Sequence, residues 1–242
     1  MSFEALYAQK RLSAHDAVRV VKNGDAIVVP TGVAEPPTLL KALSDQRREF
    51  EGVTVGQILP IQKYDYFDPE TSRNVRHLAY FVGGPSRAGA QAGWIDYVPA
   101  YFSELPALIE QGLVKSDVVF SMASPMDKHG WFSLSLGPDY TMAAIKKARA
   151  VVLEVNPNVP FAAGNCHIHI SQVTALTESE DDVLVKLLDE IKYILKENSI
   201  VLFSGIIEDK LNEVISKAED VGLEVVEVKA DKEWRAVYFK RK

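Results

Sequence analysis

The chain has 242 residues, of which 47% are hydrophobic, with a net charge of −6 at pH 7 and an isoelectric point near 5.5. A chain of this length can bury a substantial core in one large domain or two modest ones. The acidic balance argues against nucleic acid and anionic lipid as partners. A single cysteine excludes an intramolecular disulfide, no apolar run has the length of a membrane span, and the first residues lack the features of a signal peptide. The sequence therefore predicts a cytoplasmic protein.

The first 178 residues alternate between apolar runs and amphipathic or loop-rich segments. Ser13 begins a capping box that predicts a helix through Val21, and Gly24 ends it. Buried strands are predicted at 26–30, 53–59, 77–82, 117–121, 150–155 and 168–176. Helices are predicted at 37–43, 98–111 and 139–148. The alternation predicts an α/β fold with an open, mostly parallel, Rossmann-like sheet and helices on both faces.

The composition changes near residue 178. All 12 prolines precede Glu178, and the last 65 residues carry 27 charged side chains against 33 in the first 177. Two readings remain open: a junction between sequences of different origin, or a loop-rich, ligand-binding part followed by an exposed helical part of the same ancestry. We therefore predict two segments, 1–178 and 179–242.

The tail, which we define as residues 179–242, has a regular pattern. Residues 182–195 and 208–221 have the spacing of amphipathic helices, and Gly222 ends the second helix. Strands are predicted at 200–204, 223–229 and 234–240. The last two strands are close enough in sequence to form an antiparallel hairpin at a sheet edge. We expect the tail to complete the sheet of the leading segment.

Four loops follow predicted strands, and ligands gather at the carboxyl ends of the strands in open sheets. The first loop contains Gly32 ahead of a proline-rich helix start, whose free amide groups suit an anion. The second carries a single Arg87 among small residues, which suits a carboxylate or phosphate, although an ordinary ion pair also explains it. The four loops supply the candidate substrate-binding residues Thr31, Gly32, Glu35, Gly84, Arg87, Ser124, Asp127, His129, Asn156 and Asn165.

Carboxylates that could carry covalent catalysis are Glu35, Glu104 and Glu154, because a carboxylate nucleophile needs positioning and partial desolvation. A surface role or a role at a helix end explains each of them as well. Asp127 and His129 are close enough in sequence to act as an acid–base pair. The residues alone therefore assign no catalytic group.

A metal site is not predicted. His167 and His169 alternate along a predicted strand and share one face, a geometry compatible with a metal ion. No third ligand stands at a recognisable spacing. Cys166 points to the opposite face, where we expect it to be packed.

Three segments of the leading part, SPMDKHGWFSL, GWIDYVPAYFSELP and LEVNPNVPFAAGNCHIHIS, carry a resemblance to a known family. From about residue 5 to residue 178, the chain resembles the amino-terminal domain of the acetyl-CoA hydrolase and 4-hydroxybutyrate CoA-transferase family. The resemblance implies a CoA-transferase-type fold, an acyl or carboxylate pocket at the strand-end loops, and a loop-shaping role for Asp127 and His129. It also implies an active site between two such domains, with the nucleophilic glutamate in a carboxy-terminal domain that has no counterpart in this sequence.

The tail carries a second resemblance, through Ser204-Gly205-Ile206, Gly222 and Glu233-Trp234. Over about the last 60 residues it resembles the end of the methyltransferases that modify a large-subunit ribosomal protein. That family holds its donor, S-adenosylmethionine, on a glycine-rich turn after the first strand of its fold. This sequence does not contain that turn.

Together the resemblances predict a CoA-transferase-like domain with little or no activity alone, so whether the chain is an enzyme stays open. We expect no obligatory cofactor, with coenzyme A, acyl-CoA or a small carboxylate binding as substrate. The expected protein partners are a second copy of the chain, as a homodimer, or a separate second subunit. Two alternatives remain: a recombined or designed chimera with no enzymatic role, and a remnant of a methyltransferase.

Overall fold

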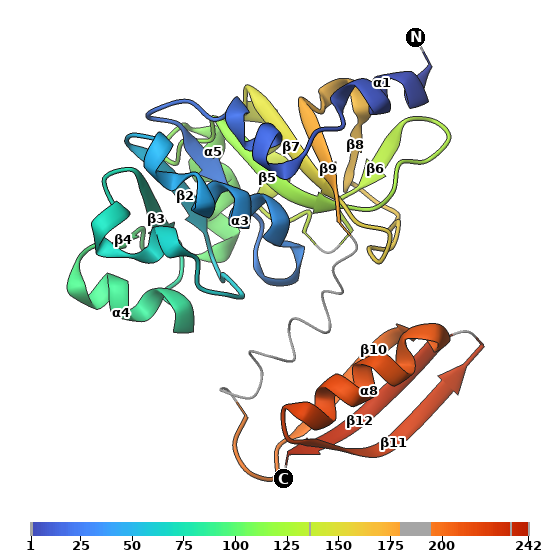
Figure 1. The fold of residues 1–242 in the computed structure, drawn as a ribbon. Helices are drawn as coiled ribbons and strands as arrows, with labels where there is room; N and C mark the ends of the chain where they lie inside the picture. Colours follow the sequence, from blue (N-terminus) through green and yellow to red (C-terminus); the bar gives the residue numbers. More distant parts are fainter. Residues whose placement is uncertain (1, 136, 180–194, 233, 242) are drawn as a thin grey trace. The chain divides into compact units, whose positions relative to one another are not determined.

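The computed structural model describes the chain except for residues 1, 136, 180–194, 233 and 242 (Figure 1). The chain divides into two compact units, a leading unit of residues 1–180 and a tail unit of residues 181–242. The expected helix at 182–195 lies almost wholly outside the described residues. Among the helices that the structure describes, none combines the length and the apolar character that crossing a bilayer requires.

A seven-stranded parallel sheet forms the centre of the leading unit. Its strands, in spatial order, are β4 (Asp96–Tyr97), β3 (Val75–Ala79), β2 (Val53–Gln57), β1 (Ala26–Val28), β5 (Val118–Ala123), β7 (Ala150–Val155) and β9 (Ala175–Glu178). Every neighbouring pair is parallel. From β1 the chain builds outward to β4, and then returns to add β5, β7 and β9 on the other side of β1.

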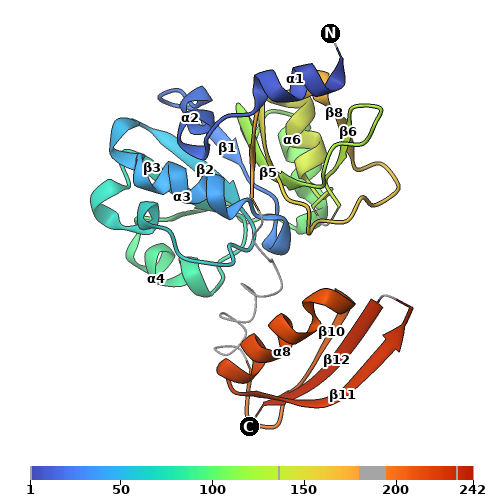
Figure 2. The same cartoon turned by 45° about the vertical axis from the view of Figure 1, so that its right-hand side comes forward.

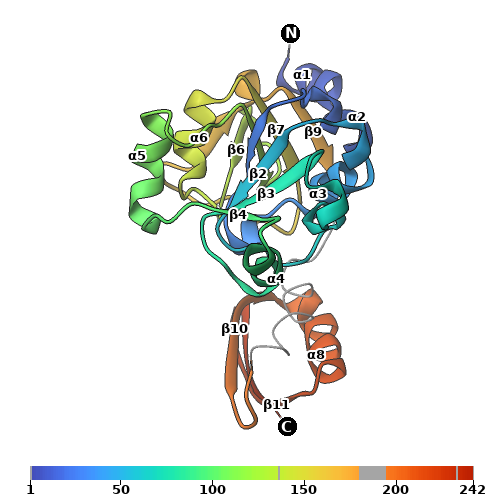
Figure 3. The same cartoon turned by 90° about the vertical axis from the view of Figure 1, so that its left-hand side faces the viewer.

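Helices cover both faces of this sheet (Figures 2 and 3). On one face lie α2 (Ala14–Ala17) and α3 (Pro37–Asp45); on the other lie α5 (Leu105–Glu110) and α6 (Thr141–Lys147). Side chains alternate between the two cores, because successive residues of a strand point to opposite faces. Ile27 belongs to the cluster beneath α3, whereas Val28 belongs to the cluster beneath α5 and α6.

The remaining helices of the leading unit are α1 (Phe3–Lys10) and α4 (Gly84–Ala92). Short 3₁₀ turns occur in both units, at Val18–Val20, Gly32–Ala34, Arg47–Glu49, Asp65–Phe67, Pro69–Thr71, Phe102–Glu104, Ile170–Gln172 and Glu208–Lys210. A separate antiparallel pair joins β6 (Trp131–Ser133) to β8 (His167–His169).

The amino-terminal segment closes one edge of the sheet. The N–H of Leu12 donates to the carbonyl of Leu176 on β9 at 2.8 Å, and Arg11 forms an isolated parallel bridge with the same residue. The Tyr7 hydroxyl donates to Glu178 at 2.7 Å, and the ammonium group of Lys10 donates to the carbonyl of Ile170 at 2.8 Å. The leading unit therefore covers its own last strand, which would otherwise be exposed for pairing.

The tail unit forms a three-stranded antiparallel sheet of its own. Its order is β10 (Ile200–Ile207), β12 (Trp234–Arg241) and β11 (Leu223–Asp231), and α8 (Leu211–Asp220) lies over one face (Figure 1). Its core consists of buried residues from all four elements: Val201, Phe203, Ile206, Val214, Ala218, Leu223, Val237 and Phe239.

The predicted fold class, a mostly parallel α/β sheet with helices on both faces and a closing antiparallel hairpin, is confirmed. The expectation that the tail completes the leading sheet is wrong, since the two sheets share no strand. The reason is physical: β9 is already covered by residues 11–12, and α8 gives the tail strands an apolar partner of their own.

Two local predictions are also corrected. The apolar run at 168–176 is not one strand, because His169 and Gln172 cap a 3₁₀ turn that separates β8 from β9. The second predicted loop, which carries Arg87, is largely the helix α4, in which Pro85 occupies the first turn and the Ser86 hydroxyl accepts the N–H of Gly83. Glycine and proline in that segment mark a helix start, where proline's missing N–H costs nothing.

Candidate functional site

The carboxyl edge of the parallel sheet is the candidate site. Strands β1 and β5 are neighbours, yet the chain leaves them toward opposite sides of the sheet, so the loops that follow them separate there. Ligands of open parallel sheets bind at such a switch point. The loop after β1 contains Thr31, Gly32 and Glu35, and the loop after β5 begins at Ser124.

The turn after β1 is held by Asp139. The N–H of Thr31 donates to one carboxylate oxygen of Asp139 at 3.0 Å, while the other oxygen accepts the N–H and the hydroxyl of Thr141 at the start of α6. Burial raises the pKa of Asp139, and these hydrogen bonds oppose the rise. Gly32 has a φ of 51°, and a side chain added there would meet no atom within 4 Å. The turn thus needs glycine for its backbone angle and leaves open space beside it.

Glu35 is buried, with 2% of its surface exposed, and is held by donors from the end of β2 and from the loop after it. Its carboxylate accepts from the Gln57 amide at 2.7 Å, from the N–H of Ile61 at 3.0 Å and from the Tyr64 hydroxyl at 2.6 Å. Burial and the nearby carboxylate raise the pKa of Tyr64, so that its hydroxyl stays a donor. Glu35 therefore joins two strand-end loops.

The other two candidate carboxylates cap helices. Glu154 on β7 is completely buried, and it accepts the N–H groups of Thr38 and Leu39 at 2.9 and 3.1 Å in the first turn of α3. Pro36, which precedes that helix, offers no side-chain cap, so Glu154 does so from across the sheet. Glu104 is exposed and accepts the N–H of Tyr101 at 3.0 Å.

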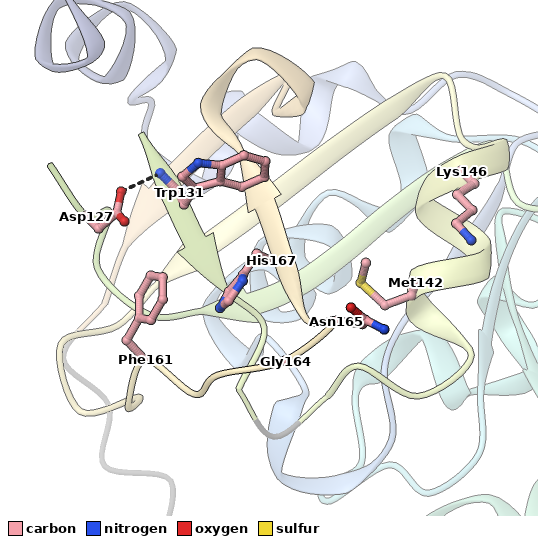
Figure 4. A pocket seen from close by; sticks show the side chains of 8 residues that line it. All are labelled: Asp127, Trp131, Met142, Lys146, Phe161, Gly164, Asn165 and His167. Carbon is pink, nitrogen blue, oxygen red and sulfur yellow. Dashed lines mark hydrogen bonds between the residues drawn. The ribbon is translucent and has the colours of Figure 1, made fainter. Parts of the chain in front are cut away.

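A pocket of about 600 Å³ lies between α6, the β6–β8 pair and the connection from β7 to β8 (Figure 4). Asp127 and Asn165, two of the sequence candidates, line it. Lys146 is exposed on α6 and forms no ion pair with any residue that the structure describes. The remaining lining residues are Trp131, Met142, Phe161, Gly164 and His167.

Asp127 organises the loop that leads into this pocket. One of its carboxylate oxygens accepts the N–H groups of His129 and Trp131, each at 2.8 Å (Figure 4 draws the second). The hydrogen bond from the Trp131 amide lowers the pKa of Asp127, which keeps the carboxylate charged. The side chain of His129 is exposed, and its imidazole has no hydrogen bond to a described residue. A loop-shaping role for Asp127 is what this geometry supports.

The other candidates do not come together at one point. Ser124 is buried and accepts the N–H of Ser133 at 3.0 Å, which ties β5 to β6. Asn156 is buried and accepts the N–H of Asn158 at 2.8 Å in the turn after β7. Gly84 begins α4, and Arg87 is exposed on that helix without an ion pair to any described residue.

The two histidines of β8 hydrogen-bond within the protein: a ring nitrogen of His167 lies 2.8 Å from the carbonyl of Ala162, and one of His169 lies 2.8 Å from the Ser171 hydroxyl. In the part of the chain that the structure describes, no group of three or more His, Cys, Asp or Glu residues could hold a metal ion. Cys166 is buried and lies 3.4 Å from the Ser133 hydroxyl.

The family model of the acetyl-CoA hydrolase/transferase amino-terminal domain matches residues 1–208. The chain belongs to this family. Among its relatives, the succinyl-CoA:cyclohexane-1-carboxylate CoA transferase of Geobacter metallireducens is 43% identical over 183 residues, which are 74% of this chain and 41% of that protein. The 4-hydroxybutyrate coenzyme A transferase of Clostridium kluyveri is 32% identical over 76% of this chain and 43% of its own length. The chain thus spans less than half the length of these curated relatives.

A solved structure supports the fold of this acetyl-CoA hydrolase/transferase unit. RipA from Yersinia pestis superposes with a TM-score of 0.70 and 27% identity, covering 82% of this chain and 51% of that one.

The tail matches a second family. The model of the ribosomal protein L11 methyltransferase family covers residues 181–242, so the two matches overlap over 181–208. The L11 methyltransferase of Fusobacterium nucleatum is 69% identical over 98 residues, which are 40% of this chain and 28% of that protein. Similarity to two families along one chain agrees with both resemblances drawn from the sequence.

Sequence reasoning missed three residues of the acetyl-CoA hydrolase/transferase unit: Lys146, Gln57 and Tyr64. Lys146 lies in a predicted helix, and no local pattern says that this helix borders a pocket. Gln57 had a usable signal, since a polar side chain at the end of an apolar strand needs a buried partner.

Proposed function

We propose that the leading unit binds a small carboxylate or an acyl-CoA in the pocket of Figure 4 and needs a second protein part for full turnover. The observation that carries the proposal is Lys146, an exposed cation that has no ion pair with a described residue and that lies on the wall of a pocket of about 600 Å³ in a member of this family. The volume is typical of small-molecule sites.

The lining has the chemistry that such a ligand requires. The Lys146 ammonium group would attract a carboxylate or phosphate, and the Asn165 amide would donate a hydrogen bond. Met142, Phe161 and Trp131 supply apolar walls against which an acyl or pantetheine chain would pack. Asp127, held charged on the opposite wall, would repel an anion and so orient it toward Lys146.

The names of the relatives support the substrate class. They are CoA transferases acting on succinyl-CoA, cyclohexane-1-carboxylate and 4-hydroxybutyrate, and this chain spans 41–43% of their lengths. By the resemblance, the nucleophilic glutamate belongs to a carboxy-terminal domain. Glu35 and Glu154 are occupied by hydrogen bonds that build the fold, so neither is free to replace it. We infer that turnover requires a second domain or a separate subunit that supplies this glutamate.

No cofactor is part of this proposal, and the single, buried Cys166 suits the reducing cytoplasm. Thr31, Gly32, Gly84 and Arg87 remain proposed substrate contacts, whereas Asn156 is buried and its side chain holds the turn after β7.

A second candidate is a chimera in which the tail has no enzymatic role. It is favoured by the separation of the tail as a unit with its own core and its own family match. A methyltransferase remnant is the third, weakened because the sequence lacks the glycine-rich donor turn.

Titration calorimetry separates these candidates on one sample. We expect binding of acyl-CoA esters or short carboxylates and none of S-adenosylmethionine. Replacing one charge-assisted hydrogen bond should cost about 1.5–3 kcal/mol, so Lys146→Met should weaken binding at least about tenfold. Lys147→Met is the matched control, because Lys147 is also exposed on the same helix and is not among the residues that line the pocket.

Equal affinity of both variants would show that the ligand does not bind at Lys146. If the chain bound neither a CoA ester nor a carboxylate, the proposal would be overturned. Efficient thioester exchange by the purified chain alone would overturn the need for a second subunit. Tight binding of S-adenosylmethionine would restore the methyltransferase reading.

A further inference from the structure

The two edges of the tail sheet differ in charge. In β10 (Ile200–Ile207) the eight residues IVLFSGII carry no charged side chain and no proline. In β11, the opposite edge, Glu224, Glu227, Lys229 and Asp231 interrupt the strand. Charged side chains on an edge strand prevent its pairing with other chains, and a long uncharged edge promotes it. Only β11 is protected in this way.

The free edge of β10 offers apolar surface on both of its faces. Val201 and Phe203 point into the core beneath α8 and are at most 8% exposed. Ile200 and Leu202 alternate with them, and 73% and 51% of their surfaces are exposed. Within the described residues, β12 is the strand that pairs with β10, so the other row of its backbone N–H and C=O groups lacks a strand partner.

We propose that β10 pairs antiparallel with β10 of a second copy of the chain, which joins two tail sheets into one of six strands. Antiparallel pairing of a strand with itself is self-complementary only if no like charges meet, and β10 meets that condition. The same pairing of β11 would bring Glu227 and its neighbours against like charges. The two-fold axis would stand perpendicular to the sheet, so both α8 helices would cover the same face.

The register follows from the bulge. Pairing of β10 with β12 shifts between Phe203 and Ile206, so the regular part of the strand lies near its start. Directly opposite residues of an antiparallel pair lie on the same face of the sheet. The two-fold axis must therefore pass beside a residue that pairs with its own copy, and an axis at Leu202 gives the longest regular overlap of the two strands. Val201 of one copy then lies beside Phe203 of the other, which makes the two inner cores continuous, and the two exposed Leu202 side chains cover each other.

Sedimentation equilibrium on the full chain tests the proposal. We expect a dimer whose dissociation constant rises at least tenfold in Leu202→Lys, because that change places like charges opposite each other. Val226→Lys is the matched control, since Val226 is 63% exposed on the other edge, and it should leave the dimer unchanged. Both positions are exposed, so circular dichroism should show an unaltered fold.

The register has its own test. Leu202→Cys should form a disulfide-linked dimer on mild oxidation, whereas Val226→Cys should not, and the native Cys166 is buried. A monomeric chain at all concentrations would overturn the proposal, as would a dimer that Leu202→Lys leaves intact. A complex with a different protein that requires β10, formed while the chain stays monomeric, would also reject the second copy as occupant.

Discussion

The sheets of the two units are covered to different extents. In the leading unit, helices cover both faces, and the amino-terminal segment closes the edge at β9 through Leu12 and Tyr7. In the described part of the tail, α8 covers one face of the sheet, and on the other face Ile200, Leu202 and Trp234 are at least 42% exposed. The outer face and the β10 edge of the tail sheet are therefore surfaces from which association is expected, whereas the β9 edge of the leading sheet is covered.

The difference extends to chemistry. The leading unit connects its parallel strands by long crossovers, whose loops meet at one edge and carry Asp127, Asn165 and the turn at Gly32. The described strands of the tail are antiparallel, and only two residues of sequence separate β11 from β12. The pocket of Figure 4 is formed by the longer connections of the leading unit.

The largest expected effects come from separating the two cores. Phe120 on β5 and Phe239 on β12 are both fully buried, one in each unit. Truncating such a side chain costs about 3–5 kcal/mol. We expect differential scanning calorimetry to resolve two transitions, with Phe120→Ala lowering the leading transition and Phe239→Ala lowering the other.

Each variant serves as the control for the other. If either substitution moved both transitions together, the two units would share cooperativity, and their description as independent cores would fail.

The pH dependence of stability should also differ between the two units, because the buried His77 belongs to the core of the leading unit. Both ring nitrogens of His77 are buried without a hydrogen-bond partner among the described residues, and burial lowers its pKa from 6.5 to about 3. The unfolded chain therefore takes up a proton as the pH falls below 6.5, whereas the folded unit does so only near pH 3. The contribution of His77 to the free energy of unfolding is therefore fully present above pH 6.5. It falls by about 1.4 kcal/mol per pH unit as the pH drops from 6.5 toward 3.

Denaturant unfolding between neutral pH and pH 4 measures this loss against His77→Leu, which has no proton to bind. The wild-type leading transition should fall more steeply than that of the variant, and the tail transition should behave alike in both. Parallel slopes in the two proteins would show that His77 is accessible to protons in the folded state.

A smaller change in stability is expected when the two carboxylates that cap helix starts in the leading unit, Glu154 and Glu104, are replaced. Glu154→Gln replaces the buried carboxylate that accepts two N–H groups at the start of α3, so we expect a loss of about 1–2 kcal/mol. Glu104→Gln alters an exposed cap and should change stability by less than about 0.5 kcal/mol. Equal losses measured by urea unfolding would contradict the assignment of Glu154 as a long-range helix cap.

Much of the fold is predictable because both faces of the leading sheet are buried. Continuous apolar runs gave β7 at its observed bounds and most other strands within a few residues. The prediction of one strand at 168–176 was wrong, because hydrophobic periodicity does not reveal the capped 3₁₀ turn after His169. The sequence also did not predict that residues 11–12 cover the edge of β9. Leu12 pairs with Leu176, which lies more than 160 residues away, and a single sequence carries no sign of such a pairing.

The site was less predictable than the fold. Position after a strand selected Asp127 and Asn165, which line the pocket, but it also selected Ser124 and Asn156, whose side chains hold turns. Lys146 comes from the last turn of α6, and packing near the β6–β8 pair makes that helix a pocket wall. Which polar residue faces a ligand depends on tertiary contacts that local spacing does not encode.

The smallest expected effect is the most decisive for the comparison. Removing residues 181–242 should change the free energy of unfolding of the leading unit by less than about 0.5 kcal/mol, the range for changes that touch no buried contact. The reason is that β9 already pairs with the segment at Leu12, and no strand of the tail belongs to its sheet. Urea unfolding of the shortened and full chains, monitored at the leading transition, provides the measurement. A loss of more than about 1 kcal/mol, or of cooperativity, would mean that the tail stabilises the leading sheet through contacts other than strand pairing, and the two units would then have to be treated as one.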